Sequence, residues 1–150
     1  MNVRDIMTTA VITVPPEMDV HALAALFVDK GISGAPVVDA SGAMQGVVLE
    51  EGLIVRDKKV HLPTFLYILT GFVTIGESRF EQEMKKMASS TVAGIMNADP
   101  VTVSPETPVE EVATLMVEKG IYYFPVKEGG KLAGVVTRKD IVRAMAQNKI

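Results

Sequence analysis

Hydrophobic and polar residues alternate along this chain in short blocks that occur twice in the same order. Each copy begins with a short apolar run, at 11–14 and again at 101–103. These runs are too short for a helix and rich in β-branched residues, which predicts a strand. A helix of about 12 residues, two further strands and a second helix follow in each copy. The pattern therefore predicts a β-α-β-β-α unit that is present twice.

The second copy shows the boundaries of its first helix most clearly. Thr107, Pro108 and Glu110 predict a capping box with proline at the first helical position. Gly31 and Gly120 stand where the first helix of each copy should end in a left-handed residue. The apolar residues of the helix in copy two recur every three or four positions and predict one buried stripe, made of Val109, Val112, Ala113, Met116 and Val117.

Each copy then predicts a hairpin and a closing helix. The glycine-containing stretches at 39–42 and 128–130 supply the two hairpin turns. The strands and closing helices are expected at 35–38, at 44–49 and from about residue 50 in copy one, and at 123–126, 132–137 and 138–147 in copy two.

A direct comparison of the two halves shows that they are copies of one unit. Shifted by 89 residues, Val3–Val37 aligns with Val92–Val126, and sixteen of the 35 pairs are identical. One residue is then lost in the second copy, the offset becomes 88, and Gly46 aligns with Gly134. The repeat predicts one unit at 1–55, a second at 92–150, and an inserted helical segment at 56–91.

The insertion has an apolar first half, 62–75, and a second half, 77–87, with the pattern of an amphipathic helix. The apolar stretch is shorter than the about 20 residues that a bilayer span needs, so no membrane span is predicted. We expect this stretch to pack on the core or on a second subunit. A membrane-surface contact is the alternative.

Composition narrows the possible functions. The 150 residues are 48% hydrophobic, which is enough apolar material for a core. The chain has no cysteine and two histidines, which argues against disulfides, zinc-thiolate sites and histidine-rich metal sites. A net charge of -3 without a long basic block argues against nucleic-acid binding. The first residues lack a secretory signal, so a cytoplasmic location is expected. No nucleophile–base pair is recognisable, so no enzyme is expected.

One motif carries a family resemblance. Gly134–Asp140 reads as a strand that ends on a Thr-x-x-Asp helix start, and Gly120-Ile121 and Pro125-Val126 precede it at fixed spacings. This arrangement, with its duplication, resembles a tandem pair of CBS domains, also called a Bateman module. The resemblance implies an α+β fold in which two β-α-β-β-α units pack about a pseudo-twofold axis and form two equivalent clefts.

The resemblance also implies a function. Such pairs usually form homodimers and act as regulatory sensors of small molecules. Their clefts often bind an adenosine-containing ligand such as AMP, ADP, ATP or S-adenosylmethionine, and no cofactor is required. The protein that would be regulated is another polypeptide, which the sequence does not identify. A ligand-independent dimerisation or interaction module is the alternative reading of the same repeat.

The start of the last helix suits a nucleotide on physical grounds. The first N–H groups of a helix have no internal partner and carry the positive end of its dipole, which favours phosphate. Arg138 and Lys139 add two positive charges to that turn. Asp140 stands three residues after Thr137, where its carboxylate could accept the hydroxyls of a ribose. The same Thr-x-x-Asp pattern is also an ordinary helix cap.

The resemblance places the other half of this site in copy one. Ile12 and Ile32 are expected on the two faces of the base, and Ser33 is expected to offer a hydroxyl group. Met7 is expected beside the first strand as a further ligand contact.

The corresponding cleft of copy one departs from the pattern. Leu49–Gly52 replaces Thr137–Asp140, so two glutamates stand in place of the basic pair and the ribose acceptor is lost. Two negative charges would oppose a phosphate there. Val101, Tyr122 and Tyr123 are expected on the base side of this second cleft, or as core or interface residues. The asymmetry predicts one competent site per chain and two per dimer.

Overall fold

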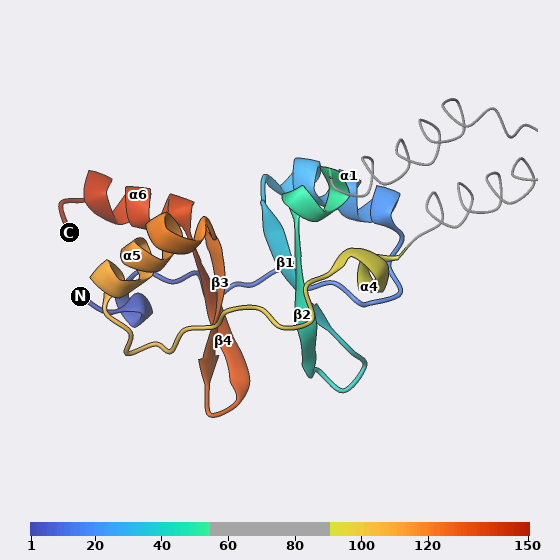
Figure 1. Ribbon diagram of the computed structural model, residues 1–150, viewed down its shortest axis with the longest axis horizontal. Coiled ribbons are helices and arrows are strands. Elements are labelled where there is room, and N and C mark those ends of the chain that lie inside the picture. The colour runs from blue at the N-terminus through green and yellow to red at the C-terminus, as the bar shows by residue number, and fades with distance from the viewer. Residues whose placement is uncertain (55–90) are drawn as a thin grey trace, which may run out of the picture.

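The computed structural model describes residues 1–54 and 91–150, which form two units with the same order of elements (Figure 1). The helices expected at 62–75 and 77–87 lie outside these residues. Residues 50–54 are helical. The other elements in chain order are η1 (Val3–Asp5), α1 (Val20–Lys30), β1 (Gly34–Val38), β2 (Met44–Leu49), α4 (Val92–Ile95), α5 (Val109–Lys119), β3 (Tyr123–Glu128), β4 (Lys131–Thr137) and α6 (Arg138–Ala146).

The first helix of each unit ends at the expected glycine. α1 stops at Gly31, whose φ is 62°, and α5 stops at Gly120, whose φ is 65°. Glycine adopts this left-handed conformation without the steric cost that a Cβ brings, so the chain turns from each helix into the next strand. Both helix ends predicted from the sequence are confirmed.

Two antiparallel hairpins form the sheets of the units. β1 pairs with β2 and β3 pairs with β4, with Pro36 opposite Val47 and Pro125 opposite Val135. The buried faces of these hairpins meet the first helices, so each unit has its own apolar core. The hairpins expected from the sequence are confirmed.

The strands expected at 11–14 and 101–103 are wrong, because each segment forms only one isolated bridge. Val14 forms one parallel bridge with Val37, and Val103 forms the equivalent bridge with Val126. The next backbone donor along each ladder would come two residues after the bridged valine. That residue is Pro16 in copy one and Pro105 in copy two. Proline has no N–H, so neither ladder continues.

Two expectations for α5 are also wrong. Pro108 is the N-cap and has an extended backbone, and the hydroxyl of Thr107 accepts a 3.1 Å hydrogen bond from the backbone N–H of Ser104 instead of capping the helix. Val117 is 83% exposed, because the buried stripe of the helix is limited to positions 109, 112 and 116.

The segment before each first strand packs on the other unit. The backbone N–H of Val3 in η1 donates to the carbonyl of Thr107, and the Val3 side chain is buried in the core of the second unit. In the same way, the N–H of Val92 in α4 donates to the carbonyl of Met18, and Val92 is buried in the core of the first unit. Neither η1 nor α4 was expected from the sequence pattern.

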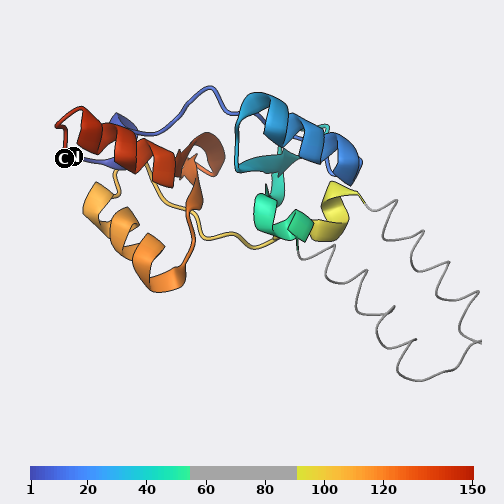
Figure 2. The ribbon, with the colours of Figure 1, turned by 90° about the horizontal axis from the view of Figure 1, so that it is seen from above.

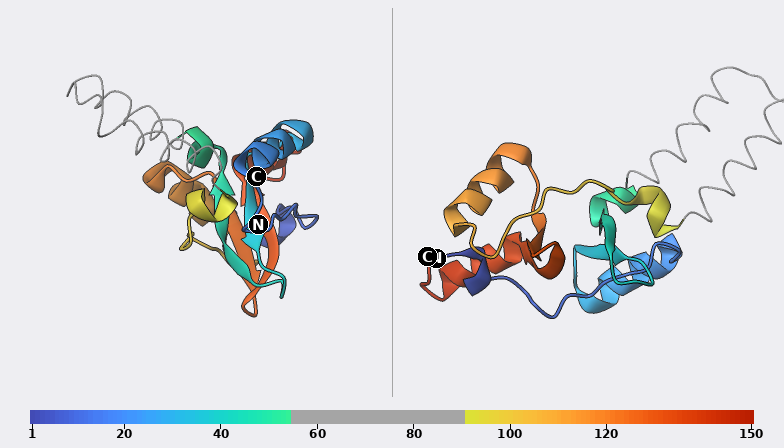
Figure 3. Two further views of the ribbon diagram at one scale, coloured as in Figure 1. Left: turned by 90° about the vertical axis from the view of Figure 1, so that its right-hand side faces the viewer. Right: turned by 90° about the horizontal axis from the view of Figure 1, so that it is seen from below.

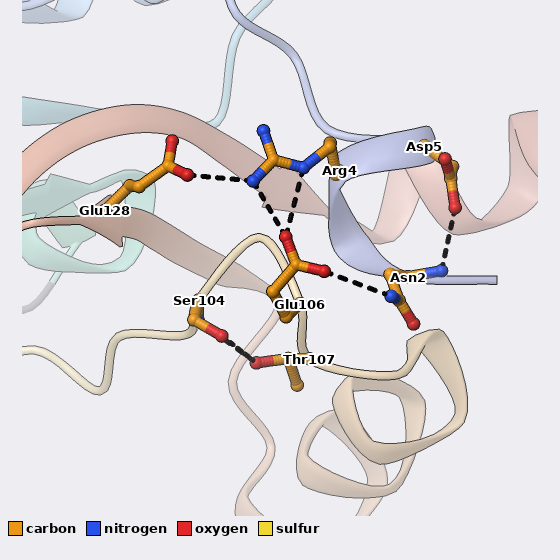
Figure 4. A network of polar contacts seen from close by, with 7 residues as sticks. All are labelled: Asn2, Arg4, Asp5, Ser104, Glu106, Thr107 and Glu128. Carbon is orange, nitrogen blue, oxygen red and sulfur yellow. Dashed lines mark hydrogen bonds and ion pairs between the residues drawn. The ribbon is translucent and has the colours of Figure 1, made fainter.

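A polar network also ties the N-terminal segment to the second unit (Figure 4). Arg4 Nη2 lies 2.8 Å from a carboxylate oxygen of Glu106 and 2.8 Å from one of Glu128. These groups are exposed, and exposed ion pairs contribute little to stability. The buried contacts of Val3 and Ile6 therefore contribute most to holding the segment on the second unit.

Equivalent backbone pairs join the two units. Thr8 and Val135 exchange two hydrogen bonds of 2.8 and 3.0 Å, and Asn97 and Val47 exchange two of 2.8 and 2.9 Å. Thr8 and Asn97 are 89 residues apart, and Val47 and Val135 are 88 apart, which are the offsets of the repeat. Seen from above (Figure 2) and from below (Figure 3, right), α1 and α6 lie along one side and α5 and residues 50–54 along the other. This is the expected pseudo-twofold arrangement.

Candidate functional site

A cleft of about 720 Å³ opens between the units, where the end of α1 faces the first turn of α6. Lys139 spans it, because its Nζ donates a 3.4 Å hydrogen bond to the carbonyl oxygen of Gly31. The cleft brings together seven of the eight residues expected at the site, namely Ile12, Ile32, Ser33, Thr137, Arg138, Lys139 and Asp140.

Met7 is the expected residue that does not line this cleft. It packs against the core of the second unit, beside Gly134. A Cβ at position 134 would lie 2.7 Å from the carbonyl oxygen of Thr8 and 3.1 Å from Met7 Sδ. Glycine therefore lets the N-terminal segment approach β4 closely, and it is the next residue of that segment, Thr8, that lines the cleft.

Asp140 is the most densely bonded side chain of the site. It is 3% exposed, and its Oδ2 accepts hydrogen bonds from the N–H of Thr137 (2.8 Å) and from the Thr137 hydroxyl (2.9 Å). Its Oδ1 accepts from the hydroxyl of Thr8 (3.0 Å) and from Nη1 of Arg143 (2.9 Å). The Thr-x-x-Asp motif thus caps α6, and it also links the N-terminal segment to the cleft.

Tyr122 and Tyr123 line this cleft, and Tyr123 is a buried core residue between the units, which is the second of the two places expected for these tyrosines. The physical reason is strand register, since Tyr123 pairs with Thr137 and the residue before it meets the start of α6. The N–H of Arg138 donates to the carbonyl of Tyr122 (3.2 Å), and the guanidinium lies 4.8 Å from the centre of the Tyr122 ring. The two side chains form a cation–π contact on the wall of the cleft.

Tyr123 occupies the centre of the interface between the units. A Cβ on Gly34 would lie 2.9 Å from its ring, so the glycine leaves the space that the ring fills. Burial raises the pKa of the Tyr123 hydroxyl above its usual value, and the nearby charge of Asp140 raises it further. The phenol is therefore a neutral wall of the site at physiological pH.

Glu50 also lines this cleft, although the sequence placed it only in the other one. Its backbone N–H donates to the carbonyl of Ser33 (3.0 Å), which is the repeat equivalent of the contact between Arg138 and Tyr122. The first turns of both closing helices therefore face the same space. Glu51 is not among the residues that line it.

Two cations of the cleft were missed by sequence reasoning. Lys30 is the last residue of α1, directly before the glycine that ends the helix, and Arg143 lies one turn after Asp140 on α6. The sequence does carry a signal for both residues. Lys30 is adjacent to the predicted helix end at Gly31, and Arg143 follows Asp140 by three positions, so it lies on the same face of the helix. With Arg138 and Lys139, four cations and two carboxylates line the cleft.

The equivalent position of copy one is built differently. A Cβ on Gly52 would lie 3.3 Å from the carbonyl oxygen of Ile95, so a larger side chain would be tightly confined there. Asn97 stands where the other cleft has Thr8. The carboxylate of Asp140 and the hydroxyl of Thr8 thus have no counterpart at Gly52 and Asn97.

Comparison with known proteins settles the family. A family model for the CBS domain matches residues 3–58 and 92–147. The chain belongs to the CBS domain family. The paired matches correspond to the two copies of the repeat, so the protein contains a tandem CBS pair.

The CBS pair is similar to several known proteins. It is 30% identical over 142 residues to the chloroplastic CBS domain-containing protein CBSX2 of Arabidopsis thaliana, covering 91% of this chain and 59% of that one. It is 27% identical over 154 residues to an uncharacterised protein of Methanocaldococcus jannaschii, covering 97% of this chain and 91% of that one. A crystal structure of CBSX2 in complex with AMP superposes with a TM-score of 0.76 at 28% identity, covering 99% of this chain and 98% of that one.

Two further properties of the CBS pair concern residues 1–54 and 91–150. In this part of the chain, no three histidine, aspartate or glutamate side chains lie together as metal ligands would. None of its helices has both the length and the apolar character to cross a bilayer.

Proposed function

We propose that this CBS pair is a regulatory sensor that binds one adenosine-containing ligand per chain in the cleft around Thr137 and Asp140. The observation that carries the proposal is the cleft itself, where apolar walls from one unit face the first turn of α6 and a buried carboxylate from the other. The likeness to CBSX2, which has been crystallised with AMP, supports an adenine nucleotide as the ligand.

Each proposed ligand contact follows from the chemistry of the lining residues. Ile12 and Ile32 are partly buried and apolar, as a slot for a base requires. The hydroxyl of Ser33 is available for a polar atom of that base. The phosphate would lie at the N-terminus of α6, beside Arg138 and Lys139, where the helix dipole and two charges favour an anion. AMP, ADP and ATP fit this end better than S-adenosylmethionine, whose sulfonium is positively charged.

Isothermal titration calorimetry of ligand-free protein with AMP tests the site. We expect about one AMP per chain and a loss of at least tenfold in affinity for Asp140→Ala, corresponding to ~1.4 kcal/mol. Asp19→Ala is the matched control, because Asp19 also caps a helix with its carboxylate but does not line the cleft. A stoichiometry near two per chain, or equal affinities of Asp140→Ala and wild type, would contradict the proposal.

A ligand-independent interaction module is the competing function. A ligand at 100 times its dissociation constant stabilises a protein by ~2.7 kcal/mol, which a melting curve detects easily. The proposal predicts a rise in Tm with at least one of AMP, ADP, ATP and S-adenosylmethionine. Unchanged melting with all four would favour the competing function.

We further propose that the sensor is a homodimer without catalytic activity of its own. Ligand binding would change the geometry of the dimer, and another protein would respond to that change. Exposed apolar side chains support a second subunit. Val28 on α1 and Val117 on α5 are repeat equivalents and are 85% and 83% exposed, and Val142 and Met145 are exposed on α6. Light scattering should show a dimer that Val117→Glu weakens. A monomeric wild type would exclude signalling through dimer geometry.

A further inference from the structure

The carboxylate of Asp140 has no free acceptor position in the structure. A carboxylate has about four lone-pair sites, and protein donors fill four here. A ribose hydroxyl that donates to Asp140 must therefore displace one of these donors. The identity of the displaced donor determines what binding a ribose costs.

Arg143 is the donor that is able to leave. The N–H of Thr137 is backbone at the start of α6. The hydroxyls of Thr8 and Thr137 are able to turn, but they belong to short side chains on backbone that is held by the pairing with Val135 and by the start of α6, so they stay beside the carboxylate. Arg143, in contrast, is a long side chain that is 53% exposed and contacts Asp140 from the cleft. Its guanidinium is hydrated when it leaves Asp140, whereas the carboxylate stays buried and needs another donor in its place.

We propose that Arg143 is a ligand-specificity residue of the cleft. In the free protein its guanidinium occupies a position on Asp140 that the ribose takes, and on binding it moves from Asp140 to the phosphate of the ligand. This inference rests on the proposed function, because it assumes that a ribose reaches Asp140.

The exchange makes the phosphate necessary for tight binding. Adenosine alone displaces a charge-assisted hydrogen bond and offers the guanidinium no new partner. A nucleoside phosphate replaces the lost carboxylate with another anion that pairs with a guanidinium through two parallel N–H···O bonds. The cleft therefore selects phosphorylated adenosine over adenosine, and over ligands with a cationic tail.

The charges around Arg143 agree with this selection. Lys30, Arg138 and Lys139 line the same cleft, and within residues 1–54 and 91–150 Glu50 is the only lining carboxylate besides Asp140. While Arg143 is paired with Asp140, the two charges cancel. Once a ribose takes its place, Arg143 adds a further positive charge to those that face the phosphate.

Calorimetry of wild type and Arg143→Gln with adenosine and with AMP tests the exchange. We expect Arg143→Gln to bind adenosine about threefold tighter, because no ion pair has to be broken. We expect its preference for AMP over adenosine to fall about tenfold, or ~1.4 kcal/mol. Lys131→Gln removes the same charge outside the cleft and should change neither value. Arg143→Lys keeps the charge without the planar guanidinium, so its preference for AMP should lie between the two.

The outcomes separate this inference from the proposed function. Weaker adenosine binding by Arg143→Gln, with an unchanged preference for AMP, would show that Arg143 only positions Asp140 and would overturn the inference alone. A wild-type protein that binds none of the adenosine-containing ligands would remove the proposed function as well. If Arg143→Gln does not fold, the same two criteria apply to Arg143→Lys, for which wild-type values for both ligands would overturn the exchange.

Discussion

Replacing Asp140 by asparagine tests the energetic role of the buried carboxylate. Asparagine has the same shape, and its amide oxygen is able to keep the hydrogen bonds from the N–H and hydroxyl of Thr137. Its amide nitrogen then faces the hydroxyl of Thr8, which is able to turn and accept, and the guanidinium of Arg143, which has no acceptor. The substitution therefore removes the contact with Arg143 and leaves the cap of α6 in place.

The structure sets the expected size of this loss. A hydrogen bond to a charged group contributes about 1.5–3 kcal/mol, and the lower end applies because Arg143 is half exposed and returns to water. At about 2–4 °C per kcal/mol for a chain of this size, a loss of about 1.5–2 kcal/mol lowers Tm by ~3–8 °C. Urea unfolding followed by circular dichroism gives the free energy, and calorimetry gives Tm.

Two comparisons make the measurement decisive. Asp99→Asn changes an exposed carboxylate of similar size and should stay within about 0.5 kcal/mol of wild type. Introducing Asp140→Asn into the Arg143→Gln background should cost at least about 1 kcal/mol less than in wild type, since the two residues are in contact. Additive effects, or an Asp140→Asn variant that melts within 1 °C of wild type, would show that the contact with Arg143 does not stabilise the folded chain.

Two further predictions concern the interface between the units. Gly134→Ala and Gly46→Ala each place a methyl group against the backbone of the other unit's N-terminal segment, so both should lose about 1–3 kcal/mol in urea unfolding. Gly134→Ala alone should also weaken AMP binding, because it displaces Thr8 from the cleft. Equal affinities of the two variants for AMP would show that Thr8 does not contribute to the site. The pKa of Tyr123 is raised in the folded chain, so the unfolded chain loses the phenol proton at lower pH. The contribution of Tyr123 to the free energy of unfolding is therefore complete below the ordinary tyrosine pKa of 10.0. Above that pH the free energy of unfolding falls by about 1.4 kcal/mol per pH unit. Tyr123→Phe should flatten this alkaline decline in melting experiments between pH 9 and 11, and an unchanged decline would exclude Tyr123 as its source.

Local chemistry is sufficient for much of the fold. The left-handed glycines that end α1 and α5, the two hairpins and the cap at Thr137 all depend on residues within a few positions of one another. Such features are readable from a sequence because periodicity, glycine φ angles and capping side chains act over one turn or one hairpin. The doubling of the pattern then points to two equivalent units. The prediction of the two short strands was wrong, because their pairing partners are distant in sequence and a proline removes the next donor of each ladder.

The composition of the cleft is where the sequence alone was insufficient. The repeat, its hairpins and main helices, and one half of the site around Asp140 are readable from the sequence. The packing of the two units brings Tyr122 and Glu50 to this same cleft, places Thr8 beside Asp140 across 132 positions, and leaves Met7 outside the cleft lining. These placements depend on the register between β3 and β4 and on the packing of each N-terminal segment on the opposite unit. Contacts of that kind are set by the fit of whole surfaces, which no local pattern along the chain encodes.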